Sequence, residues 1–80
     1  MTKTEILCNL QEQMACQYRG YYHYTSNGDT EKADKAYRRV WSIYWCGLDL
    51  LGDSYMSKLS AARRAAKIMA RHFQDALNSK

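Results

Sequence analysis

Proline does not occur in this 80-residue chain, so no position excludes a helix outright. Turn-forming residues gather in two places, at residues 26–29 and 52–54. These breaks leave three long segments, at about 3–25, 30–51 and 54–78, in which apolar residues recur at helical spacing. We therefore expect an all-α protein. Because so short a chain cannot build two cores, we expect a single helical domain over residues 1–80.

Residues at the segment ends are typical of helix caps. Thr2 and Glu5 have the spacing of a capping box, in which the hydroxyl and the carboxylate each accept from a free backbone N–H group. Asp29 or Thr30 can cap the second segment in the same way. Gly52 can end that segment, because glycine tolerates a left-handed backbone.

Apolar residues cover most of the circumference of the second segment. The remaining polar wedge is narrow and consists of Lys35, Arg38, Arg39, Ser42 and Asp49. A helix of this kind needs neighbours on two sides. We therefore expect a three-helix bundle with the second helix central, either between the other two or in an oligomer interface. Cys46 on this helix is expected to be a small buried group.

The third segment carries a regular apolar face, expected to pack on the core. Its members are Leu59, Ala62, Ala66, Met69, Phe73, Ala76 and Leu77. Two glycines, Gly20 and Gly47, lie inside helical patterns at a cost of about 1 kcal/mol each relative to alanine. Their presence indicates close helix contact or a local kink.

Positive charge is concentrated in the second and third segments. The net charge of +4 divides into 2 basic and 4 acidic residues over 1–31, against 10 and 4 over 32–80. Four cations fall within an arc of about 100° on the third helix: Arg63, Arg64, Lys67 and Arg71. This basic face suits phosphate or carboxylate oxygens; the alternative interpretation is a solvated outer surface.

Aromatic residues are the second feature that points to binding, since the chain has seven Tyr, two Trp and one Phe. Tyr and Trp combine a large apolar body with one hydrogen-bonding group, which suits protein interfaces and base stacking. Four tyrosines lie on the apolar stripes and are expected to pack in the core: Tyr18, Tyr21, Tyr37 and Tyr44. By helical phase, Tyr24 and Trp45 lie away from these stripes and are predicted to be surface anchors.

No arrangement of residues predicts catalysis. His23 and His72 are isolated, and neither has a cysteine or carboxylate at metal-ligand spacing. We expect no catalytic residues, no metal and no cofactor, and hence a protein that is not an enzyme. The odd number of cysteines without CxxC spacing suggests reduced thiols. The chain also lacks a long apolar stretch and a signal-peptide core, so we expect a cytoplasmic protein without membrane contact.

In its general character the chain resembles the small all-helical accessory proteins of phages and mobile elements, including anti-CRISPR inhibitors. These proteins are short, cytoplasmic, rich in Tyr and devoid of catalytic motifs. The resemblance implies inhibition by occupying a surface of a nucleic-acid-processing complex. Many such inhibitors are acidic mimics of nucleic acid, whereas this chain is basic.

Three functions follow from the sequence as hypotheses. The first is a non-enzymatic interaction module that blocks or modulates a larger protein partner through Tyr24, Trp45 and the basic face. The second is a nucleic-acid-binding protein that places the basic face on phosphates. The third is a structural homodimer with the apolar second helix at its two-fold axis.

Overall fold

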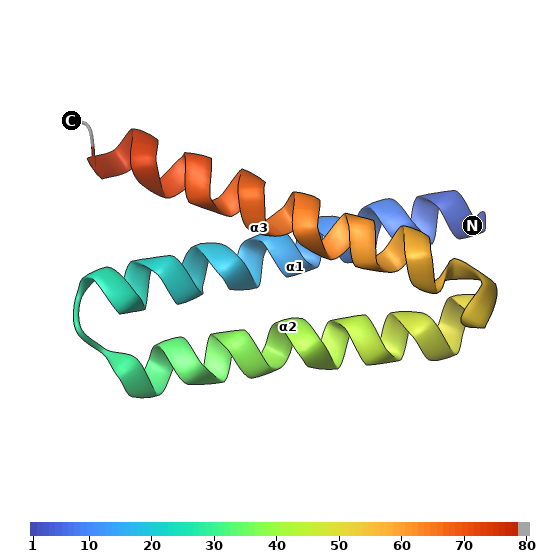
Figure 1. Ribbon diagram of the computed structural model, residues 1–80, viewed down its shortest axis with the longest axis horizontal. Coiled ribbons are helices and arrows are strands. Elements are labelled where there is room, and N and C mark those ends of the chain that lie inside the picture. Colours follow the sequence, from blue (N-terminus) through green and yellow to red (C-terminus); the bar gives the residue numbers. More distant parts are fainter. Residues whose placement is uncertain (79–80) are drawn as a thin grey trace.

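The computed structural model describes residues 1–78, and these form three long helices (Figure 1). They are α1 (Lys3–Ser26), α2 (Thr30–Leu51) and α3 (Met56–Asn78), with a 3-10 turn, η1 (Asp53–Tyr55), before α3. No strand occurs within the described range. The predicted all-α three-helix bundle is therefore confirmed, and its first two helices match the expected bounds to within one residue.

Local capping explains where the helices begin and end. The Thr2 hydroxyl accepts from the N–H of Glu5 at 3.1 Å, and the Glu5 carboxylate accepts from the N–H of Thr2 at 3.3 Å, which completes the predicted capping box. Asp29 caps α2 by accepting from the N–H of Lys32 at 3.2 Å. Gly52 ends α2 with a φ of 93°, a value that L side chains rarely adopt.

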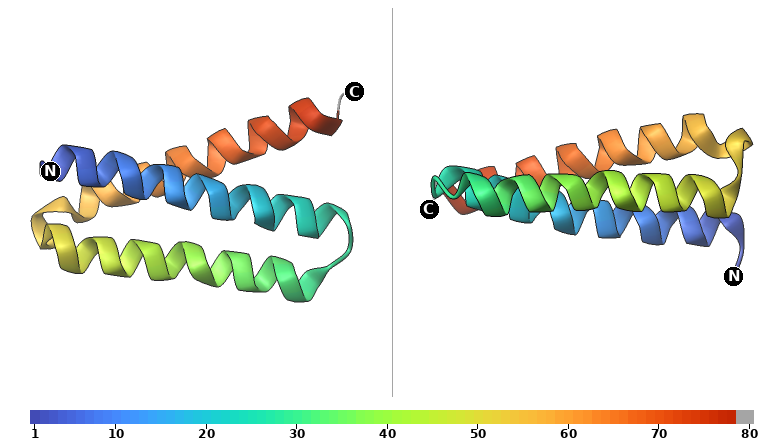
Figure 2. Two further views of the ribbon diagram at one scale, coloured as in Figure 1. Left: turned by 180° about the vertical axis from the view of Figure 1, so that it is seen from behind. Right: turned by 90° about the horizontal axis from the view of Figure 1, so that it is seen from below.

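The helices do not pack around α2, as the sequence led us to expect, but around α1. Helices α1 and α3 run in the same direction and α2 runs against both (Figure 1). Helix α1 packs extensively on each of its neighbours, whereas α2 and α3 contact each other only slightly. From the η1 turn, α3 crosses over α1 and diverges from α2 (Figure 2). The prediction that the second helix is central is therefore wrong.

Small side chains explain why α3 prefers α1. Leu59 and three alanines of α3, spaced by three or four residues, form a buried stripe that can approach α1 closely. The core also contains Met14 and Tyr18 of α1, both with no exposed surface. The main cluster of buried core residues is Leu10, Met14, Ala15, Tyr18, Val40, Tyr44, Leu48, Leu51, Leu59, Ala62, Ala66 and Ala70.

Two groups of apolar residues are left uncovered by this arrangement. On the outer side of α2, Leu50 is 64% exposed and Cys46 is exposed rather than buried as predicted, and on the side turned toward α3, Trp45 is 56% exposed. The second half of α3 diverges from the bundle, so four residues predicted to pack on the core are exposed. One is Ala76, and the other three are about half exposed. These are Met69, Phe73 and Leu77.

The two helical glycines have different surroundings. A Cβ atom added at Gly47 would lie 2.7 Å from Cδ1 of buried Leu10, whereas one added at Gly20 would lie 3.9 Å from its nearest neighbours, an ordinary contact. Close helix contact, one of the two reasons expected from the sequence, therefore explains Gly47.

We predict opposite effects for alanine at these two positions. Gly20→Ala should raise the free energy of unfolding by up to about 1 kcal/mol, because helix propensity improves without a clash. Gly47→Ala should lower it by about 1 kcal/mol, because overpacking against Leu10 outweighs the same gain. Chemical denaturation of both variants measures the difference, and equal stabilisation of the two would contradict the packing described here.

Candidate binding surface between α2 and α3

Three of the four cations of the basic face lie on the side of α3 that is turned toward α2. Arg63, Lys67 and Arg71 follow each other at intervals of four residues, so they form a row along one side of the helix. Arg64 lies at the outer edge of this row. The orientation of the row follows from Arg63, which contacts Trp41 of α2, and from Lys67, which lines a cleft with Tyr37 of α2.

Arg63 is a packing residue rather than a free cation. Its guanidinium donates to the hydroxyl of buried Tyr18 at 3.0 Å and lies 4.8 Å from the centre of the Trp41 ring. The side chain is half-buried and connects all three helices. The basic face predicted from the sequence therefore has three members available for binding, not four.

The other three cations, Arg64, Lys67 and Arg71, are exposed and have no ion pair within residues 1–78. We call them the outer cations. On α2, by contrast, three of the four cations pair with acids of the same helix or its cap, and Arg39 alone has no ion pair within residues 1–78. These pairs are Lys32 with Asp29, Lys35 with Glu31, and Arg38 with Asp34. Between these two helices, the unpaired positive charge thus lies mostly on α3.

A row of aromatic rings borders the outer cations. Successive ring centres lie between 5.2 and 6.4 Å apart, mostly edge to face. In order, the rings belong to Tyr22, Tyr21, Tyr37, Trp41, Tyr44 and Trp45. This aromatic row starts on α1, crosses to α2 and follows the side of α2 that is turned toward α3.

The divergence of α3 opens a cleft between the aromatic row and the outer cations. The cleft has a volume of about 430 Å³, with Tyr21 and Tyr37 on one side and Lys67 on the other. Its remaining walls are Thr25, Thr30, Ala33 and Asp34. Asp34, the one acid among these lining residues, is paired with Arg38 at 2.9 Å.

The two predicted aromatic anchors lie in different places. Trp45 ends the aromatic row, and its ring packs against Tyr44, whose hydroxyl is hydrogen-bonded to Ser60 of α3 at 2.9 Å. Trp45 therefore lies on the side of α2 that is turned toward α3, at the end of the aromatic row opposite Tyr22. Tyr24 is half-buried in a hollow formed by α1 and α2 alone, where Lys32 lies 5.6 Å from its ring centre.

Of the four tyrosines predicted to pack in the core, only two are buried. Tyr18 and Tyr44 are buried, as expected, whereas Tyr21 is half-buried and Tyr37 is 38% exposed. The last two keep part of their surface exposed because the cleft separates them from α3. At the far end of the aromatic row, burial raises the pKa of the Tyr22 hydroxyl above its usual value, and the Arg71 guanidinium opposes that rise.

The chemistry of this surface is that of binding. Exposed cations beside aromatic rings can hold carboxylates or phosphates next to flat or apolar groups. Within residues 1–78, no cluster of three or more His, Cys, Asp or Glu side chains could hold a metal ion. No helix in that range combines the length and the apolar character needed to cross a membrane.

Sequence reasoning identified the cations and the aromatic residues as separate features but not that the two lie side by side. The signal was present as two matching patterns with four-residue spacing. One is Tyr37, Trp41 and Trp45 on α2, and the other is Arg63, Lys67 and Arg71 on α3. Only the antiparallel packing of α2 and α3 sets the two patterns side by side.

Removal of the Arg63 guanidinium should destabilise the protein. We expect Arg63→Met to lower the free energy of unfolding by about 2 kcal/mol, because the buried Tyr18 hydroxyl loses its partner. Arg64→Met, the matched control, should change it by less than about 0.5 kcal/mol. Adding Tyr18→Phe to Arg63→Met should recover part of the loss. Denaturant titration checks all three, and equal effects of the two arginine variants would refute the packing role.

A scan against protein-family models and searches of curated proteins and solved structures found no significant match to this chain. Its function is therefore inferred from its own geometry. The features available for that inference are the outer cations, the aromatic row that borders them, and the exposed Trp45 at the end of that row.

Proposed function

We propose that this chain is a non-enzymatic interaction module that binds an acidic surface of a larger protein partner and, by covering it, blocks or modulates that partner. The observation that carries the proposal is the exposure of Arg64, Lys67 and Arg71, which have no acidic partners within residues 1–78, next to a row of aromatic rings that ends in the exposed Trp45. The resemblance to small phage accessory proteins makes a cytoplasmic nucleic-acid-processing complex the class of partner to test first.

The composition of this surface supports a protein partner. Tryptophan, tyrosine and arginine are the residues most enriched among those that dominate binding energy at protein interfaces. A tryptophan held by a neighbouring ring loses little conformational freedom on binding, and Trp45 packs against Tyr44 at 5.2 Å. The outer cations add a long-range field that speeds encounter with an acidic surface.

Replacing the outer cations with neutral residues should weaken binding of the partner without unfolding the protein. In a nuclease-treated lysate of the natural host, the triple variant Arg64→Ala, Lys67→Ala, Arg71→Ala should retain about tenfold less partner than the natural chain. Trp45→Ala should weaken binding to the purified partner by about thirtyfold, as expected for an anchor worth about 2 kcal/mol.

The matched control removes three charges from a different surface. Lys32, Lys35 and Arg39 line the hollow next to Tyr24, and their triple alanine variant should retain the partner at the natural level. Loss of the partner in this control, with retention in the outer-cation variant, would contradict the proposal and favour the Tyr24 surface instead. Circular dichroism of all variants verifies that they remain folded.

Binding to single-stranded nucleic acid is the second candidate, and the aromatic row favours it. Proteins that bind single strands combine a positive groove for the backbone with rings on which bases stack. Here Tyr37 and Lys67 line the same cleft, and Trp41 lies next along the aromatic row. A phosphate on Lys67 would therefore have rings within reach of its base.

The salt dependence of the binding affinity distinguishes a nucleic-acid ligand from the protein partner proposed first. A fluorescent single-stranded oligonucleotide should bind with an affinity that falls with the logarithm of salt concentration, with a slope of about 0.7 per phosphate contacted. The outer-cation triple variant should reduce that slope by about 2, since three contacts are lost. An oligonucleotide that fails to bind at low salt, or a slope unchanged in the variant, would exclude nucleic acid as the ligand of this surface.

A further inference from the structure

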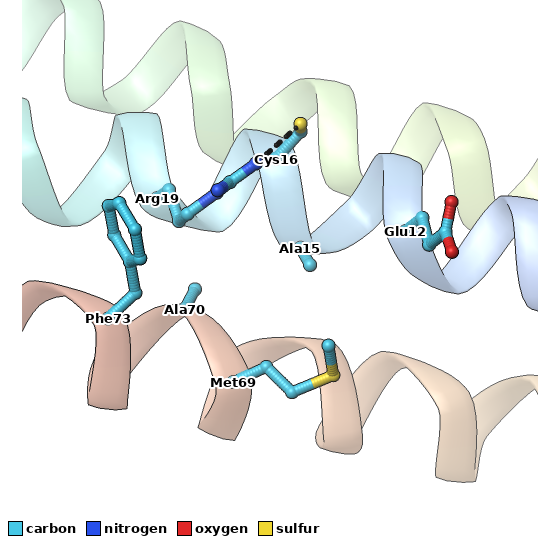
Figure 3. A pocket seen from close by; sticks show the side chains of 7 residues that line it. All are labelled: Glu12, Ala15, Cys16, Arg19, Met69, Ala70 and Phe73. Carbon is cyan, nitrogen blue, oxygen red and sulfur yellow. Dashed lines mark hydrogen bonds between the residues drawn. The ribbon is translucent and has the colours of Figure 1, made fainter.

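A second hollow lies between α1 and α3 and contains no residue of α2. It has a volume of about 350 Å³, and we call it the α1–α3 groove. Figure 3 shows its side chains, with Ala15 of α1 and Phe73 of α3 pointing into the space between the two helices. The residues that matter for its chemistry are Glu12, Ala15, Cys16, Arg19, Met69 and Phe73.

The groove exposes apolar surface that elsewhere on α3 is buried. Ala66 and Ala70 lie on the same face of the helix and are almost completely covered by α1. One turn further on, Phe73 is 47% exposed, and Met69 beside it is 49% exposed. Because α3 diverges here, the apolar face continues beyond the point where its own bundle covers it. Apolar surface of this kind is typical of an interaction site.

The charges of the groove are arranged symmetrically about its centre. Glu12 and Arg19 are seven residues apart on α1, so they lie on the same side of the helix, two turns apart. The Arg19 guanidinium lies 5.0 Å from the Phe73 ring centre and donates to Sγ of Cys16 at 2.9 Å. Neither Glu12 nor Arg19 has an oppositely charged partner within the described chain.

These positions make the groove complementary to a copy of itself. The midpoint of Glu12 and Arg19 falls between residues 15 and 16. Met69 and Phe73 line the same groove and are centred on residue 71. Consider a two-fold axis that crosses the groove at its centre, at right angles to both helices and in the plane of the interface. A rotation of 180° about this axis sets Glu12 against the partner's Arg19 and Met69 against the partner's Phe73. Both contacts occur twice, as two-fold symmetry requires.

We propose that the α1–α3 groove is the two-fold interface of a homodimer, in which α1 and α3 of one protomer pack antiparallel on the same helices of its partner. Two features select a second copy as the occupant. One is the presence of an acid and a base without oppositely charged partners in the same groove, and the other is the exposed apolar pair, Met69 and Phe73, that lines it. This interface differs from the α2-centred dimer suggested by the sequence.

The dimer is independent of the proposed function. The groove contains none of the outer cations and no residue of the aromatic row. Loss of partner binding and loss of dimerisation can therefore be measured separately.

Charge exchange between the two positions tests the interface. The natural protein should show a concentration-dependent monomer–dimer equilibrium in sedimentation. Glu12→Arg alone and Arg19→Glu alone each place like charges opposite one another twice, so each should raise the dimer dissociation constant by about tenfold or more. An equimolar mixture of the two single variants should restore the dimer, because each acid then faces a base across the interface.

The control is Asp49→Arg, which makes the same acid-to-base change at an exposed position of α2 and should leave the dissociation constant unchanged. Three results would overturn the proposal. They are a natural chain that stays monomeric at millimolar concentration, a dimer insensitive to both single variants, and a mixture that stays monomeric while each variant is folded by circular dichroism.

Discussion

The contact that holds the three helices in register is the Arg63 side chain. It starts on α3, donates to the buried hydroxyl of Tyr18 on α1, and lies over the ring of Trp41 on α2. Helices α2 and α3 are both positioned by their packing on α1, and this residue and the Tyr44–Ser60 hydrogen bond join them directly where they otherwise have little contact. A guanidinium suits this role because its planar, weakly hydrated group can donate a hydrogen bond and stack on a ring together.

Beyond Arg63, the divergence of α3 creates both candidate surfaces. Toward α2 it opens the cleft in which Lys67 lies across from Tyr21 and Tyr37. On its other side it leaves Met69 and Phe73 uncovered next to α1. If α3 packed against the bundle along its whole length, these apolar residues would be buried and the cleft would be closed. As a result, part of the apolar surface of α3 stays outside the core, and the bundle has two exposed surfaces with different chemistry.

The two surfaces can operate together. In the proposed dimer the outer cations of both protomers stay exposed, so two copies of the cationic surface are presented by one assembly. Linked sites bind a repeated or extended partner more tightly than a single site does, provided their spacing matches that of the partner. Dimerisation would therefore strengthen the partner binding that we propose, although neither requires the other.

Much of the fold was determined by local sequence. The absence of proline, the Thr2–Glu5 capping box, the Asp29 cap and Gly52 define the helices, because these signals act within a few residues. The cations of α3 could likewise be identified from helical spacing. The order of packing could not, since the apolar arc of α2 predicts two neighbours but does not specify which helix supplies them. The tertiary structure made α1 central, because the alanine stripe of α3 packs closely on it. It also removed Arg63 from the binding face and brought the aromatic row beside the outer cations, because these relations depend on contacts between residues far apart in the chain.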